Sequence, residues 1–215
     1  MVRAPVYPLT GGGPAALLVL GLLGTVPFGG IAGWLLLVFL CALVVRDSIR
    51  GRDAFPGLAA LRGTPDPGGL WVRALASTTV VLSPVLAALA LAMLAASFPE
   101  EGPLRAAAGI AIPAGAFLGF VGVLFVPAAL VLAVSDPEPF AILQPGRIRG
   151  VTRSLAAATV VSGFGAFFLL LALGVVNKLA PTTVARGLDM AILSGLFFVI
   201  ARLTGLGARS RVPLA

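Results

Sequence analysis

The amino-acid sequence predicts an all-α fold, a polytopic helical membrane protein with about six transmembrane helices. Three observations lead to this fold class. Hydrophobic residues make up 59% of the 215 residues and charged residues only 11%, whereas soluble domains have about 25% charged residues. The apolar residues form runs long enough to cross a bilayer, which takes about 20 residues. The basic residues gather between those runs and give a net charge of +7.

The first apolar run covers residues 14–45. As one straight helix it would be about 48 Å long at about 1.5 Å per residue, well beyond a hydrocarbon core of about 30 Å. Its middle, residues 25–30, reads TVPFGG, and a proline followed by two glycines favours a turn. The run therefore predicts two helices, about 8–26 and 29–46, and the alternative is one tilted or kinked helix.

Later apolar runs predict four further spans. They cover about 71–97, 104–134, 152–176 and 187–206. Pro84 lies inside the first of these spans, and Pro113 and Pro127 lie inside the second, so each predicts a helix kink. A broken helix can offer backbone carbonyls to a solute, and the alternative is a kink satisfied by neighbouring groups.

The basic residues predict the orientation of these spans. With six spans and a cytoplasmic N-terminus, twelve basic residues are cytoplasmic: Arg3, Arg46, Arg50, Arg52, Arg62, Arg73, Arg147, Arg149, Arg153, Arg202, Arg209 and Arg211. Three lie on the other side: Arg105, Lys178 and Arg186. This bias follows the positive-inside rule, and a five-span arrangement moves only Arg3 across. We therefore expect a protein of the inner (plasma) membrane with both termini cytoplasmic. The excess of arginine over lysine indicates a GC-rich genome, which favours a bacterial source.

Two charged segments, the first elbow (46–62) and the second elbow (136–153), connect predicted spans on the cytoplasmic side. Phe55, Leu58 and Leu61 in the first, and Phe140, Ile142 and Leu143 in the second, predict interfacial helices in the headgroup plane. The alternative is that arginines simply anchor helix ends. The predicted lipid-facing basic residues are Arg46, Arg50, Arg52, Arg62, Arg73, Arg147, Arg149 and Arg153. Their predicted partner is an anionic lipid headgroup, and no nucleic acid is expected.

The segments after the two elbows resemble each other. Residues 71–83 align with 151–163 without gaps, and both contain arginine followed by a similar apolar pattern. One interpretation is a parallel repeat of two helices. The other is chance matching, which arises easily in apolar sequence of low complexity.

The sequence predicts no catalytic residue, no cofactor and no metal site. The chain has no histidine, which excludes His ligands and His general bases. The nucleophile candidates Ser77, Ser83, Ser162, Ser194 and Cys41 each need a base, and no buried one is apparent. Asp136 and Glu138 could bind a cation as paired carboxylates, or form a rigid solvated turn with the neighbouring prolines.

Small residues in the fourth predicted span suggest helix packing. Gly115 and Gly119 have GxxxG spacing and Gly122 follows about one turn later, which lets helix backbones approach closely. These glycines pack helices either within the chain or between chains, against a membrane protein partner or a second copy. We expect a non-enzymatic structural or partner subunit, with these small residues facing outward. The alternative is a transporter for a neutral or lipid-like solute, with a midplane cavity lined by Ser83, Pro84, Pro113 and Ser162.

Several of these positions resemble an uncharacterised family of multi-pass bacterial and archaeal membrane proteins, known only as a domain of unknown function. The matching residues are Gly33, Trp34, Arg46, Arg50, Gly51, Asp53, Pro56, Pro127, Ala128, Phe140, Pro145 and Arg147, and the resemblance covers roughly 30–175. The chain departs from the pattern at Arg52, where the family tends to have an acid, and in having fewer aromatic residues at the end of the first elbow. The resemblance implies a helical membrane protein and no particular activity.

Overall fold

The computed structural model describes residues 6–26, 29–56, 64–96, 103–138, 140–161, 163–165 and 182–209. These residues are mostly helical and include no strand, which confirms the all-α prediction. Two of the described helices, α2 (Gly29–Ile49) and α8 (Thr182–Ala208), are long and apolar enough to cross a membrane.

The first apolar run forms two helices, as predicted. A short helix η1 (Tyr7–Leu9) precedes α1 (Gly13–Thr25), and α2 starts four residues after α1 ends. The predicted start near residue 8 was wrong because Gly11 has a φ of 54°, a left-handed conformation that ends any helix. At the turn, a Cβ on Gly29 would collide with the carbonyl oxygen of Leu23, so the TVPFGG break depends on glycine.

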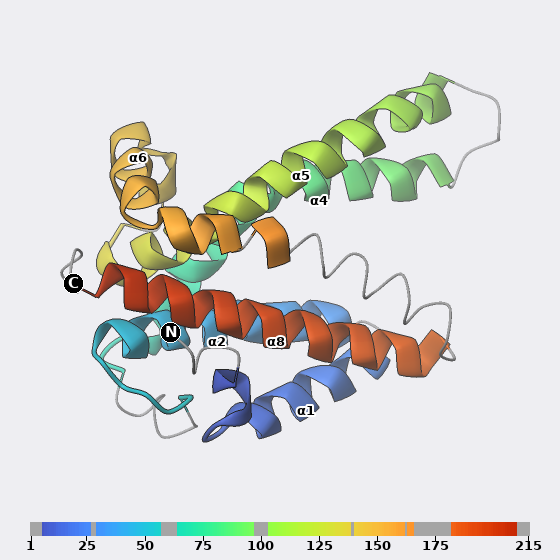
Figure 1. The fold of residues 1–215 in the computed structure, drawn as a ribbon. Helices are drawn as coiled ribbons and strands as arrows, with labels where there is room; N and C mark the ends of the chain where they lie inside the picture. The colour runs from blue at the N-terminus through green and yellow to red at the C-terminus, as the bar shows by residue number, and fades with distance from the viewer. Residues whose placement is uncertain are drawn as a thin grey trace.

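The two longest helices are α4 (Pro67–Ala96) and α5 (Pro103–Ser135). They lie side by side, and the end of the pair near residues 96 and 103 projects away from α8 (Figure 1). Proline starts both helices, as it starts α6 (Pro145–Ser154), because its fixed φ suits the first turn. The Asp66 carboxylate also accepts a hydrogen bond of 2.8 Å from the Gly69 amide, which caps α4.

A second group of helices consists of α1, α2 and α8, and glycines bring α1 close to α8. A Cβ on Gly24 would lie 2.8 Å from the Arg186 carbonyl oxygen, and one on Gly21 would lie 3.3 Å from that of Gly187. No pattern in the sequence predicted this interface. The small residues of α5 were predicted to pack helices and to face outward; Gly115 and Gly122 instead pack within the chain, and the surroundings of Gly119 are outside the described part of the structure. A Cβ on Gly115 would collide with Ala88 of α4, and one on Gly122 with the Val81 carbonyl.

The main core is formed by the second halves of α2 and α5, together with α8. Residues 37–38, 41–49 and 126–134 are all buried, and Phe198 of α8 is fully buried among them. The ends of α2, α5 and α8 and the start of α4 lie at the same end of the molecule, beside α6 (Figure 1). We call this the polar end, because the buried charged residues lie there.

The elbows differ from each other. Residues 51–56 of the first elbow are not helical, and Phe55 is buried against Tyr7 and Phe198. The prediction that Phe55 belongs to an interfacial helix was therefore wrong, since aromatic contacts inside the protein replace contact with lipid. Leu58, Leu61 and Arg62 lie outside the described residues. The second elbow does contain helices, η2 (Ala141–Leu143) and α6.

The second elbow leads into an interrupted helix. Leu155 separates α6 from helical residues 156–161 and 163–165. The fifth predicted span, 152–176, is therefore broken near its start, and its second half lies outside the described residues. The aligned segment 71–83 is uninterrupted within α4, so the two arms of the suggested repeat differ in local structure.

Candidate functional site

The polar end contains an arginine, Arg202, that is bound almost entirely inside the protein. It is 6% exposed and comes from the last third of α8. Its Nη1 donates to Ser48 Oγ at 3.1 Å and to the Arg52 carbonyl at 2.5 Å, and its Nη2 donates to Asp53 Oδ1 at 2.5 Å. The sequence predicted only that Arg202 lies on the cytoplasmic side, and it did not predict these partners. The first elbow folds back and supplies two of the acceptors.

The N-terminal segment is attached to this network through Tyr7. The Arg202 guanidinium carbon lies 4.8 Å from the centre of the Tyr7 ring, a cation–π contact. The Tyr7 hydroxyl donates to the Ala54 carbonyl at 3.3 Å. Burial raises the pKa of Tyr7 to about 12, although the Arg202 charge acts in the opposite direction. The network thus links η1, α2, the first elbow and α8.

A second buried arginine, Arg46, lies in the last turn of α2 and is 4% exposed. Its Nη1 donates to Thr64 Oγ1 at 2.5 Å, and its Nη2 lies 3.4 Å from Asp47 Oδ1. The Nε of Arg46 has no hydrogen-bond partner among the described residues. Asp47 is shared with Arg52 at 3.5 Å. The prediction that Arg46 faces lipid was wrong, because its side chain turns into the protein beside Asp47 and Thr64.

Arg46 lines a pocket of about 110 Å³ between α2, α4 and α5. The other basic residues on it are Arg50, which is exposed, and Arg73, whose side chain is 20% exposed. Arg73 Nε donates to the Ala133 carbonyl at 3.1 Å, and its Nη1 lies 3.7 Å from Asp66 Oδ2. Thr64 and Asp66 supply the polar remainder, and Leu70 and Val134 the apolar part. The pocket therefore combines three arginines with one carboxylate.

The remaining predicted basic residues are on the surface of the polar end. Arg52, Arg147, Arg149 and Arg153 are exposed, as a lipid-facing role requires. Arg147 pairs with Asp136 and lies 3.5 Å from Glu138. The two carboxylates are therefore bound by the second elbow itself. Among the described residues, no cluster of three or more His, Cys, Asp or Glu side chains could hold a metal.

The serines considered as nucleophiles bond to their own helices. Ser83 Oγ donates to the Val80 carbonyl at 2.8 Å, and Ser194 Oγ to the Met190 carbonyl at 2.6 Å. Val80 precedes Pro84 by four residues, so Ser83 satisfies the carbonyl that Pro84 leaves without an amide. α4 and α5 continue through Pro84, Pro113 and Pro127. Ser77 is buried, and Ser162 lies outside the described residues.

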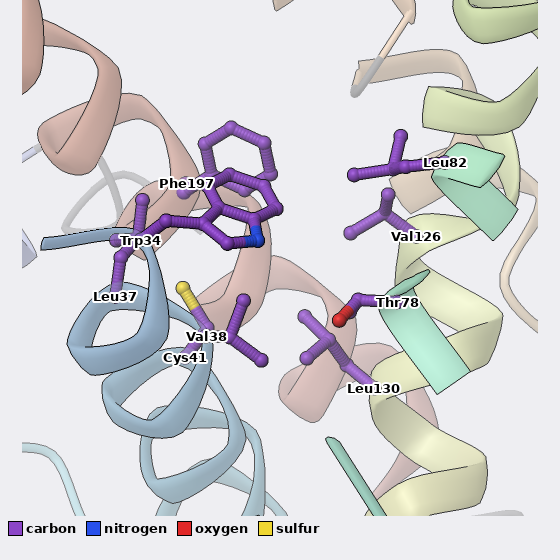
Figure 2. A pocket seen from close by; sticks show the side chains of 9 residues that line it. All are labelled: Trp34, Leu37, Val38, Cys41, Thr78, Leu82, Val126, Leu130 and Phe197. Atoms are coloured by element: carbon purple, nitrogen blue, oxygen red, sulfur yellow. The ribbon is translucent and has the colours of Figure 1, made fainter. Parts of the chain in front are cut away.

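The middle of the bundle contains a small apolar cavity (Figure 2). Its volume is about 10 Å³, enough for one water molecule at most. Trp34 and Cys41 approach from α2, Phe197 from α8, and Val126 from α5 (Figure 2). Trp34 and Phe197 meet edge to face at 5.9 Å. Of the residues predicted for a transport cavity, Ser83, Pro84 and Pro113 do not line this space, and Ser162 is outside the described residues.

Searches of family models, of curated proteins and of solved structures find no match for this chain. The resemblance carried by Gly33, Trp34 and the first elbow therefore stays a prediction. In the structure Gly33 is buried, and a Cβ there would lie 2.7 Å from the Met190 methyl group. Gly51 has a φ of 80° and lies against the Arg209 guanidinium. Both glycines thus have a local packing reason that is independent of any family.

Proposed function

We propose that the chain is a multi-pass protein of a bacterial plasma membrane, with six spans and cytoplasmic termini, and acts as a non-enzymatic structural or partner subunit. The exposed apolar side chains carry this proposal. Leu18 of α1 is 64% exposed, and Ile110 and Phe117 of α5 are 76% and 67% exposed. α1 and α5 lie on different sides of α8 (Figure 1). Exposure of this kind on several sides favours lipid as the surrounding solvent.

The packing of the bundle supports a structural or partner role over transport. A solute path needs space and polar groups near the midplane. The cavity there has about 10 Å³ and an apolar lining apart from Thr78. The Thr78 hydroxyl already donates to the Ala74 carbonyl at 2.7 Å. The described core thus resembles a packed scaffold, and its charged groups are at one end.

Purification of the full chain in mild detergent tests this role. The tagged protein is extracted from its host membrane, and co-purifying proteins are identified and quantified by mass spectrometry. We expect at least one membrane protein in a fixed stoichiometric ratio. An equally tagged, unrelated multi-pass protein from the same host is the control for adventitious capture. A monomer without a stoichiometric partner and with a water-filled central cavity would contradict the proposal and favour transport.

A further inference from the structure

We propose that the pocket formed by Arg46, Arg50 and Arg73 binds one phosphate group, carried by a lipid headgroup or by a soluble anion. This goes beyond the proposed role, which requires no ligand. The pocket lies where α2 ends and α4 begins. Arg46 is in the last turn of a helix able to cross a membrane, and Arg73 is in the second turn of α4. That position corresponds to the level of phosphates in a bilayer.

The charges on the pocket favour an anion. Three arginines and one carboxylate, Asp66, line it, and Asp47 lies beside Arg46. Asp66 pairs with Arg73 at 3.7 Å, and its side chain is 64% exposed. Among the described residues, Arg50 has no acidic group within ion-pair distance. An incoming anion therefore meets positive charge that the protein leaves uncompensated.

The hydrogen-bonding groups also favour phosphate. Arg46 is more than nine-tenths buried, and its Nε, which has almost no accessible surface, lacks an acceptor among the described residues. A buried donor without an acceptor is costly, and a guanidinium matches the tetrahedral oxygens of phosphate well. Arg46 itself is held in place by Thr64 and Asp47. The site therefore has a buried, hydrogen-bonded arginine, Arg46, and an exposed one, Arg50.

The volume of the pocket suits this ligand. It is about 110 Å³, whereas one water needs about 10–15 Å³ by a comparable measure. A phosphate group with its few heavy atoms fits, with Leu70 and Val134 forming part of the apolar wall.

Thermal unfolding of the full chain in an uncharged detergent tests the proposal. The probes are inorganic phosphate, dihexanoyl phosphatidic acid and dihexanoyl phosphatidylcholine, at constant ionic strength set with chloride. We expect a saturable rise of the unfolding midpoint with at least one of the first two probes. Arg50→Gln and Arg73→Gln should weaken the apparent affinity roughly tenfold or more. Arg149→Gln, an exposed arginine of α6 outside the pocket, should change it by less than about threefold.

The two probes separate the sources of the phosphate. If phosphatidic acid raises the unfolding midpoint at much lower concentrations than inorganic phosphate does, the ligand is a lipid headgroup. If only inorganic phosphate raises it, the ligand is a soluble anion. No saturable response to either probe, or equal weakening by Arg50→Gln and Arg149→Gln, overturns the site. Arg46→Gln is not required, since the exposed Arg50 can be changed without disturbing the core. The inorganic phosphate titration does not depend on membrane location, so its failure is distinct from failure of the proposed role.

Discussion

The two buried arginines of the polar end differ in how completely the protein satisfies them. Arg202 donates to a hydroxyl, a backbone carbonyl and a carboxylate, and it stacks near the Tyr7 ring. Arg46 is equally buried, but its Nε has no acceptor in the part of the chain that the structure describes. A buried guanidinium is stable only when its donors are used. The first arginine therefore has a structural role, and the second leaves room for a ligand.

Replacing Arg202 with Met should destabilise the protein markedly. The change leaves Ser48 and the Arg52 carbonyl without their donor, a loss of roughly 1–3 kcal/mol. Thermal unfolding in detergent measures it. Asp53→Asn is the matched control, because the Asp53 side chain is 92% exposed and a pair open to solvent contributes only about 0–1 kcal/mol. Equal destabilisation by the two variants would mean that the ion pair, and not the buried bonds, stabilises the first elbow.

The Tyr7 hydroxyl should titrate at high pH. Its pKa is raised by burial to about 12, compared with about 10 in an unfolded chain. Because the folded state favours the neutral phenol, this contribution to stability is complete below about pH 10 and is lost as the pH rises through about 12. The chain has one tyrosine and its two tryptophans do not titrate, so the pH-dependent change in near-ultraviolet absorbance on phenol ionisation reports this group alone. A midpoint near 10 in the folded protein would contradict the buried position of Tyr7.

At the scale of elements, the sequence predicted the helices better than their partners. Proline at the helix starts and TVPFGG between α1 and α2 are local signals, and they predicted elements close to those observed. The fold of residues 51–56 onto Tyr7 and Phe198 depends on contacts between distant segments, which no local pattern contains. The arginines that form the pocket were all predicted as basic surface residues. The sequence did not predict that they line one pocket, because this depends on how α2 packs against α4.

The glycine contact between α1 and α8 gives a prediction for this pair of elements. Gly24→Ala should destabilise the protein by roughly 1–3 kcal/mol, because its Cβ would lie 2.8 Å from both the Arg186 carbonyl oxygen and the Met190 Cβ. Gly109→Ala in α5 is the control, since nothing lies within 4 Å of a Cβ there. It should be neutral, or stabilising by up to about 1 kcal/mol through helix propensity. The unfolding midpoints of both variants, measured in detergent, test this prediction. Equal effects would contradict the close approach of α1 and α8.

At the scale of the whole molecule, α1 and α8 run antiparallel over the length of the bundle. Tyr7 packs near Arg202, close to the end of α8, whereas Gly24 packs against Arg186, close to its start. The N-terminal segment therefore begins at the polar end, where α8 finishes. α1 alone covers only about 20 Å at about 1.5 Å per residue, and η1 with its turn extends the path to the polar end. This arrangement supports six spans over five, because a five-span chain has its termini on opposite sides.

Cysteine labelling tests this arrangement. Cysteine is introduced separately at two positions, Arg3→Cys and Arg211→Cys, and intact cells and inverted membrane vesicles are treated with a membrane-impermeant maleimide. The single native cysteine, Cys41, is 2% exposed, so the unmodified chain serves as the background control. We expect both introduced cysteines to react in inverted vesicles and neither in intact cells, because the positive-inside rule predicts that the arginine-rich polar end is cytoplasmic. Labelling of the two positions from opposite sides would mean that α1 and α2 do not form a membrane hairpin. The contact between Tyr7 and Arg202 would then also be incompatible with the topology, since it requires both segments on one side of the membrane.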